Sequence, residues 1–299
     1  MALRVTPGMM HNNLMRNITH NLGRMENQQY MLSTGRKLNK PSDDPVGITY
    51  SLRYRSELAM NEQYDKNISA AKAQLQHTDN VLGQLNEVVQ RAKVLVVQAL
   101  NGTNPQTALD AIAVEIDTLY EQSVMIGNDS LNGKFTFNGQ LTDKKPYDAA
   151  TAETQDSDNE KSNITLSSGI SVSVNVTGNE VFGSSSEADN LFKVLKDIKN
   201  ALTPTVNNTT LNNAAARLDT RYEQIINVRS EMGARTNRVD LIDQRLQDLA
   251  LNLHDLQGEV EDADMAETIM KFTQEQSVYQ ASLATGAKIV QPTLIDYLR

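Results

Sequence analysis

Hydrophobic residues recur at steps of three and four over most of the chain, which is the spacing of an amphipathic helix. The first such stripe predicts a helix over residues 9–33 and consists of Met10, Leu14, Ile18, Leu22, Met25 and Leu32. Gly35 suits the end of this helix and Pro41 suits a turn. Asp44 followed by Pro45 predicts a new helix start, because the Asp side chain accepts from free amides and Pro needs no amide partner there.

The longest predicted helix covers residues 45–100, and its second half carries a coiled-coil repeat. The repeat positions are Ile68, Ala71, Leu75, Thr78, Leu82, Leu85, Val89, Ala92, Val96 and Ala99. A short link then leads to a predicted helix that ends near residue 126, and so short a link makes the two helices antiparallel neighbours. Further helices are predicted over 189–202 and 208–257. The last helix carries the stripe Met265, Ile269, Phe272, Tyr279 and Leu283 and is closed by Pro292.

The middle of the chain has a different period. Around residues 164–176, hydrophobic and polar residues alternate on both sides of Gly169, which predicts a β-hairpin. Residues 140–161 carry little that can be buried, so we expect a mobile loop there.

These elements predict a mainly α fold with a small β module. At 1.5 Å per residue the helix over 45–100 spans roughly 80 Å, whereas a globule of this chain length is only about 50 Å across. We therefore expect an elongated rod of long antiparallel, coiled-coil helices, with both termini at one end and a β-rich insertion at mid-chain. Three domains are predicted: a terminal helical domain (1–48 plus 258–299) that is disordered in the monomer, a helix-bundle domain (49–134 plus 188–257) and an outward β-rich domain (135–187).

Composition and charge narrow the function classes. The 299 residues include no Cys and no Trp, which excludes disulfides, Cys-ligated metals and Cys nucleophiles. The net charge of −9 argues against binding to nucleic acid or to an anionic membrane. The charge is uneven, with +5 over residues 1–40, −5 over 255–299 and −6 over 136–190, so we expect the two ends to pair with each other or with a neighbouring copy. No hydrophobic run is long enough to span a membrane, and the first 25 residues lack the core of a cleavable signal peptide.

No set of residues with enzymatic spacing is found. Phosphate-binding loops, metalloprotease motifs, nucleophile elbows and EF-hand loops are absent, and the four histidines lie far apart. Asp43 and Asp44 fit a helix cap with a loop contact better than an acid–base pair. An acidic run can hold a divalent ion or pair with the basic amino-terminal segment, and pairing is favoured; the run consists of Glu259, Glu261, Asp262 and Asp264. We predict no catalytic residues, no metal site, no cofactor and no small-molecule substrate.

Three segments resemble one family. They are Leu3-Arg-Val-Thr-Pro-Gly-Met-Met-His-Asn-Asn13, Leu32-Ser-Thr-Gly-Arg-Lys-Leu-Asn-Lys-Pro-Ser-Asp-Asp-Pro-Val46 and Asp296-Tyr-Leu-Arg299. They resemble the flagellin superfamily, over roughly 1–135 and 190–299, and the motif ending in Lys40-Pro-Ser-Asp-Asp-Pro45 is more similar to its hook–filament junction members than to flagellin itself. Gly47 stands where many relatives carry Ala, so we expect a looser helix start there.

The resemblance implies a structural, non-enzymatic adaptor of the bacterial flagellum that joins the hook to the filament. Such a protein is exported unfolded by the flagellar type III system, without a cleavable signal peptide, and assembles extracellularly as a ring. Its implied partners are a FlgK-like junction protein, flagellin, further copies of itself and a FlgN-like export chaperone. The alternatives are a minor flagellin that forms filament and a secreted enzyme, although the central insertion that would hold its active site has no His and no carboxylate constellation.

The resemblance also implies site residues. The terminal helices form an inner tube, in which an assembly interface brings the first helix against the last; its residues are Leu14, Ile18, Leu22, Met25, Leu32, Ile269, Phe272, Tyr279 and Leu283. A connector between this tube and the next shell is shaped by Arg36, Asn39, Asp43 and Asp44.

Overall fold

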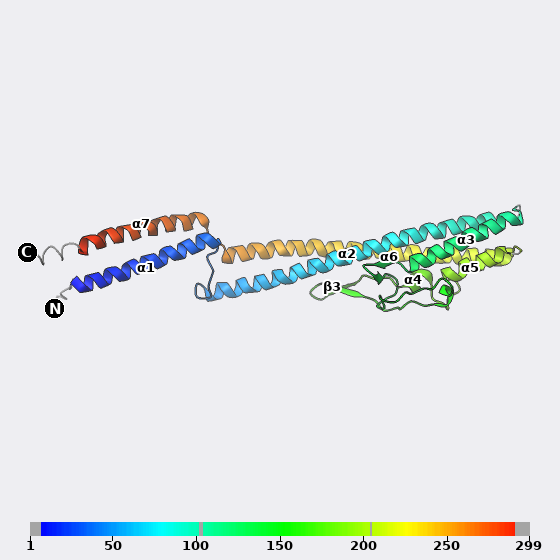
Figure 1. Ribbon diagram of the computed structural model, residues 1–299, viewed down its shortest axis with the longest axis horizontal. Helices are drawn as coiled ribbons and strands as arrows, with labels where there is room; N and C mark the ends of the chain where they lie inside the picture. Colours follow the sequence, from blue (N-terminus) through cyan, green and yellow to red (C-terminus); the bar gives the residue numbers. More distant parts are fainter. Residues whose placement is uncertain (1–6, 102–103, 204, 291–299) are drawn as a thin grey trace, which may run out of the picture. The chain divides into compact units, whose positions relative to one another are not determined.

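The computed structural model of the chain describes residues 7–101, 104–203 and 205–290, and most of them are helical (Figure 1). The helices are α1 (Pro7–Thr34), α2 (Pro45–Leu100), α3 (Gln106–Gly127), α4 (Gly178–Phe182), α5 (Leu191–Leu202), α6 (Asn208–Glu261) and α7 (Met265–Val290). Four short strands and a 3-10 turn (Ala152–Thr154) lie between α3 and α4. The predicted fold class, mainly α with a small β module, is confirmed. The predicted rod and the common end of the termini stay predictions; the termini, Pro292 and the closing Asp296–Arg299 motif lie outside the described residues.

The chain divides into two compact units. Unit 1 comprises residues 1–59 and 249–299, and unit 2 comprises residues 60–248. Helices α2 and α6 therefore each contribute one end to each unit. The three predicted domains concern layers of an assembly, and their boundaries stay predictions.

In unit 2, α2 and α6 run antiparallel along a shared hydrophobic seam. The amide of Asn61 donates to the Leu246 carbonyl (2.9 Å), and Lys93 pairs with Asp219 (2.6 Å) at the other end of the contact. All ten predicted repeat positions from Ile68 to Ala99 are buried. The coiled-coil pattern therefore marks the core of this unit.

Helices α3 and α5 complete the bundle. Arg91 on α2 donates to Glu115 on α3 (2.6 Å), and His77 on α2 lies 2.5 Å from Asp129, just after α3. These contacts confirm that α3 runs antiparallel to α2. Helix α5 packs on α3, where the ring of Phe192 meets the ring of Tyr120 edge-on at 6.2 Å.

The β part consists of two antiparallel pairs. Strands β1 (Ser130–Leu131) and β2 (Lys134–Phe135) are joined by Asn132 and Gly133, both with positive φ, as a tight hairpin turn requires. Strands β3 (Asn163–Ser167) and β4 (Ile170–Ser173) form the predicted hairpin. Strand β4 is shorter than its alternating pattern, which continues as irregular chain with Val174 and Val176 still buried.

The loop over residues 140–161 departs from its prediction. It is a loop, but Tyr147 is 1% exposed and packs against the rings of Phe182 (5.5 Å) and Phe192 (4.9 Å). Its ring lies so close to Gly127 that an added Cβ there would be 2.8 Å from Tyr147 Cδ2. The expectation that this segment has little to bury is wrong, because one aromatic side chain anchors it in the hydrophobic core that it shares with the bundle.

Candidate assembly site

In unit 1, α1 and α7 lie side by side and antiparallel (Figure 1). The Asn21 amide donates to the Ser282 hydroxyl (3.0 Å), and Arg24 donates to Glu275 (3.2 Å). Further along, Leu14 lies against Gly286, where an added Cβ would be 2.8 Å from Leu14 Cδ2. Small residues and polar contacts thus hold the two helices together.

The nine residues of the predicted assembly interface fall into two groups. One group is half-buried: Leu14, Ile18, Leu22, Met25, Leu32, Phe272 and Tyr279. Ile269 and Leu283 are instead 52% and 45% exposed. The packing of α7 on α1 therefore leaves part of the hydrophobic stripe of α7 exposed.

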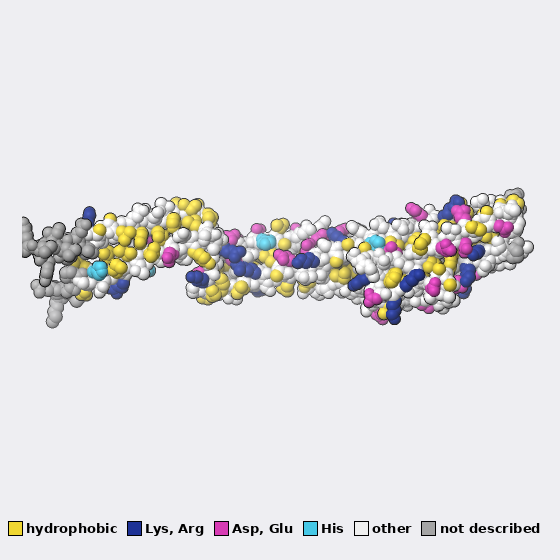
Figure 2. Space-filling model, viewed as in Figure 1, with side chains coloured by type: hydrophobic (Ala, Val, Ile, Leu, Met, Phe, Trp, Pro, Cys, Tyr) yellow, Lys and Arg dark blue, Asp and Glu magenta, His cyan; other side chains and the backbone are white. Residues whose placement is uncertain are grey.

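Exposed hydrophobic side chains are concentrated in unit 1, and Figure 2 shows many of them over α1 and α7. Unit 1 has well under half of the residues but 15 of the 23 large hydrophobic side chains that are exposed in the described chain. They are Met9, Met10, Met15, Tyr30, Val46, Tyr50, Leu52, Leu249, Leu251, Leu256, Met265, Ile269, Met270, Val278 and Leu283. Such a concentration is typical of a surface that is covered in an assembly.

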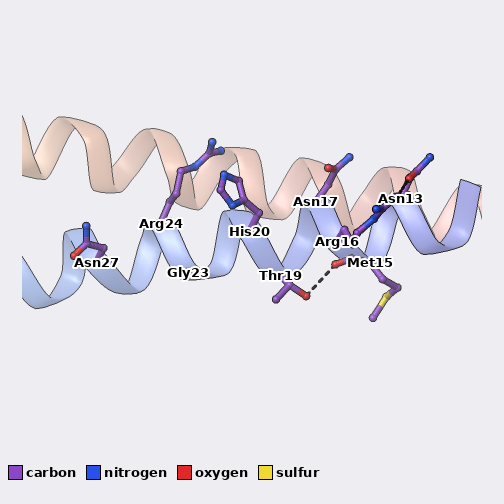
Figure 3. A pocket seen from close by; sticks show the side chains of 9 residues that line it. All are labelled: Asn13, Met15, Arg16, Asn17, Thr19, His20, Gly23, Arg24 and Asn27. Atoms are coloured by element: carbon purple, nitrogen blue, oxygen red, sulfur yellow. Dashed lines mark hydrogen bonds between the residues drawn. The ribbon is translucent and has the colours of Figure 1, made fainter. Parts of the chain in front are cut away.

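An open groove lined mostly by polar residues lies along α1 (Figure 3). His20 lines this groove, but no carboxylate lines it with which the imidazole could form a catalytic pair, and no nucleophile in the lining is paired with His20. Arg24 is engaged by Asn21 (2.8 Å) and Glu275, and Arg16 by Asn13. The groove offers hydrogen-bonding groups to a neighbour but no catalytic arrangement.

The connector begins where α1 ends. Gly35 has φ = +70°, and its amide donates to the Met31 carbonyl (2.8 Å), which is a left-handed helix cap. This confirms the helix end that Gly35 predicted.

A turn then leads into α2. Asp43 Oδ2 accepts from the amides of Asn39 (3.1 Å) and Lys40 (2.8 Å), while Asp44 Oδ1 accepts from the Val46 amide (3.0 Å). The Asn39 side-chain amide donates to the Arg36 carbonyl (2.8 Å). The structure therefore brings the four predicted connector residues together, and the paired aspartates serve as a loop contact and a helix cap.

Gly47 has a packing role at this helix start. A Cβ on Gly47 would lie 2.6 Å from Asp44 Oδ2 and 2.7 Å from Leu38 Cδ1. Glycine therefore lets the buried Leu38 and the capping aspartate approach the first turn of α2. The helix start at Gly47 is therefore closely packed, and this close packing, not a looser helix start, explains why glycine stands at this position.

The centre of the connector region is the carboxylate of Glu261, which is 1% exposed. Arg55 donates to both of its oxygens (2.8 and 2.6 Å), Gln257 donates at 3.1 Å, Ser51 donates as well, and Arg36 lies at 3.4 Å. Burial by itself would raise the pKa of Glu261, but the hydrogen bonds from Arg55, Ser51 and Gln257 and the charge of Arg55 together lower it to about 2. Glu261 is therefore a buried anion with a nearly complete set of donors.

The rest of the acidic run is exposed to solvent or caps a helix. Asp264 Oδ1 accepts from the amides of Ala266 (2.9 Å) and Glu267 (3.1 Å) at the start of α7. Within the described ranges, no group of three or more His, Asp or Glu side chains is arranged to hold a metal ion. Arg36 is a basic partner from the amino-terminal segment, as charge balance predicted. Arg55, the stronger partner, was missed, although Ser51 and Arg55 lie one turn apart on α2.

No helix in the part of the chain that the structure describes has the length and hydrophobicity to cross a membrane.

Comparisons with known proteins agree with this arrangement. Residues 5–142 match the family described as the bacterial flagellin N-terminal helical region, and residues 215–298 match the bacterial flagellin C-terminal helical region. The chain is 27% identical to flagellar hook-associated protein 3 of Salmonella typhimurium, covering 95% of this chain and 96% of that protein. It is 25% identical to flagellin of Bacillus subtilis, covering 93% of each.

Solved structures give the same result. FlgL of Bacillus cereus is similar with a TM-score of 0.60 and 26% identity, covering 69% of this chain and 99% of that one. The flagellar junction protein FlgL of Legionella pneumophila shares the fold, with a TM-score of 0.60 at 15% identity, over 71% of this chain and 100% of that one. These relatives are structural proteins, which confirms the prediction that the chain is not an enzyme. Because the two flagellin regions together account for most of its length, the chain belongs to the bacterial flagellin family and is a structural component of the bacterial flagellum.

Proposed function

We propose that this chain is the adaptor that joins the flagellar hook to the flagellin filament. The observation that carries the proposal is the end-to-end similarity to hook-associated protein 3, which is 27% identical in Salmonella typhimurium and also in Escherichia coli, over about the full length of each protein. The likeness to Bacillus cereus FlgL at 26% identity supports the same role. In this role the chain meets a FlgK-like junction protein on the hook side and flagellin on the filament side.

The surface of unit 1 supports an assembling protein. The α1–α7 pair leaves Ile269 and Leu283 exposed, and further hydrophobic side chains are exposed on the adjoining ends of α2 and α6. We propose that copies of the chain cover these side chains in a ring, with the α1–α7 pairs forming its inner tube. Before assembly, a FlgN-like chaperone covers the carboxy-terminal part, and the chain leaves the cell through the flagellar type III system.

Deleting the gene tests the junction role. Cells without the adaptor should retain hooks, lack filaments and release flagellin into the medium, because filament subunits have no surface on which to assemble. Electron microscopy of the cells and immunoblots of the medium measure both results. Normal filaments in the deletion strain would contradict the junction role.

The second candidate is a minor flagellin, and the 25% identity to Bacillus subtilis flagellin over 93% of each chain favours it as the alternative. Loss of a minor flagellin should leave filaments standing. Immunogold labelling gives an independent comparison: a junction adaptor is labelled only at the base of the filament, whereas a minor flagellin is labelled along it.

A further inference from the structure

Two connector segments of unit 1 are joined to each other. Residues 35–44 link α1 to α2, and residues 262–264 link α6 to α7. The Lys37 amide donates to the Glu261 carbonyl (2.7 Å), and the Ala263 amide donates to the Gly35 carbonyl (3.0 Å). Arg36 and Asp262 thereby form an isolated antiparallel β-bridge between segments more than 200 residues apart in sequence.

The two connectors differ in length, and the longer one needs contacts with the rest of the chain to fix the direction of the helix that it joins. The link of three residues between α6 and α7 can adopt few directions, whereas the link of ten residues between α1 and α2 can adopt many. The Lys37 ammonium adds another tie, because it donates to the Glu259 carbonyl (2.7 Å). The end of α6 therefore holds the start of the long connector, next to the end of α1.

Glu261 contributes to this joint with both its backbone and its side chain. Its carbonyl accepts from Lys37, while its carboxylate binds Arg36 of the long connector and Ser51 and Arg55 of α2. This last residue of α6 thus contacts both the long connector and α2.

We infer that Glu261 is a positioning residue that latches the two connectors together, so that α1 and α7 are oriented or released as a pair. The latch concerns the single chain, and so it goes beyond the junction role and does not depend on it. Neutralising Glu261 removes the anion that holds two guanidinium groups. Arg36 and Arg55 are 46% and 42% exposed at their side chains, so both can turn to water when the anion is lost. The α1–α7 contacts at Asn21 and Leu14 do not involve the latch and should persist.

Hydrogen exchange of the full chain tests the latch. In Glu261→Gln we expect the exchange rates of the Lys37 and Ala263 amides to rise about tenfold. Both rates should rise by the same factor, because the two hydrogen bonds belong to one opening unit. Amides at the centre of unit 2, such as that of Leu82, should not change. Glu259→Gln is the matched control, with the same loss of charge two residues away at an exposed side chain, and should leave both connector amides as they are.

The exchange rates of the two connector amides either support or overturn the latch. A rise at Ala263 without a rise at Lys37 would overturn the coupling, and so would an unchanged rate at both. If Glu261→Gln also accelerates exchange in unit 2, Arg55→Lys replaces it, because Lys retains the positive charge but loses the two-pronged contact. Joint acceleration at Lys37 and Ala263 in that variant supports the latch, and unchanged rates contradict it. The measurement uses the isolated chain, so its result is independent of the gene-deletion result for the junction role.

Discussion

Gly35 and Gly23 are both glycines of the α1 region, but their backbones make opposite demands. Gly35 has φ = +70°, whereas Gly23 lies inside the helix with no atom within 4 Å of an added Cβ. We expect Gly35→Ala to reduce the local stability of the end of α1 by about 1–2 kcal/mol because of the left-handed backbone. Gly23→Ala should increase the stability of α1 by up to about 1 kcal/mol through helix propensity.

Hydrogen exchange of the α1 amides measures both changes in one pair of variants. If both glycine-to-alanine substitutions changed the stability of α1 in the same direction, the assignment of Gly35 as the helix cap would be contradicted.

Glu261 makes the stability of unit 1 depend on pH. Its pKa is lowered from 4.5 to about 2 in the folded chain, so the folded state favours the carboxylate. The stabilisation is complete above pH 4.5, decreases as the pH falls towards 2 and is lost below the folded pKa, because protonation removes the acceptor. A shift of this size corresponds to about 3 kcal/mol between the two ends of this range.

We therefore expect the stability of the native chain to fall more steeply with acidification than that of Glu261→Gln. Denaturant unfolding at a series of pH values, followed by a signal from unit 1, measures the difference. The two curves should approach each other near pH 2, and parallel curves throughout would contradict the role of this carboxylate.

At the scale of single residues, local chemistry could be predicted and remote pairing could not. Gly35, Asp44 and Pro45 mark helix ends by their own backbone and hydrogen-bonding preferences, and the structure agrees with them. The pairing of Glu261 with Arg55 joins residues 206 positions apart, and any of several basic residues would have satisfied the charge balance. Tyr147 was missed for a similar reason, because nothing in its neighbouring sequence shows that two aromatic rings from other segments, Phe182 and Phe192, pack against it.

At the scale of elements, the hydrophobic stripe of α7 is only partly buried. Phe272 and Tyr279 are half-buried, whereas Ile269 and Leu283 are exposed. We expect the double variant Ile269→Ser, Leu283→Ser to change the stability of the isolated chain by no more than about 0.5 kcal/mol, because neither side chain is buried in it. In the assembly, the loss of hydrophobic burial should reduce function strongly.

Complementation of a deletion strain measures this effect as the fraction of cells with filaments. Leu241→Ser is the matched control, since Leu241 is 67% exposed in unit 2, away from the proposed assembly surface. Full complementation by the double variant would show that these two residues are not part of the interface.

The accuracy of the element predictions followed element length. Helix α2 was predicted from Pro45 to Leu100, which are the bounds found, because its seam repeats over several heptads. The helix α4 has five residues and the strands β1 and β2 have two each, and such segments are too short to show a period. They exist because the core of unit 2 and their turns hold them in place, as the capping box of Thr177 and Glu180 does for α4.

At the scale of the whole molecule, hydrophobic burial is unequal between the chain's parts. In α1 and α7 the buried residues among those described are Asn21, Thr268 and Gly286, none of which is a large hydrophobic residue. Unit 2, by contrast, has a continuous core with Leu75, Leu85 and many other fully buried side chains. Helices that bury little hydrophobic surface open at low cost in free energy.

We therefore expect limited proteolysis of the soluble monomer to remove about 40–50 residues from each end and to leave a core near residues 50–255, since local opening exposes the backbone to the protease. Mass spectrometry of the fragments after short digestion gives the cut sites. In the assembled state the same ends should resist digestion, because the exposed side chains of α1 and α7 are then covered by neighbouring copies. An amino-terminal segment that resists the protease in the monomer would mean that the α1–α7 pair is stable by itself, and the ordering of the ends would then not require assembly.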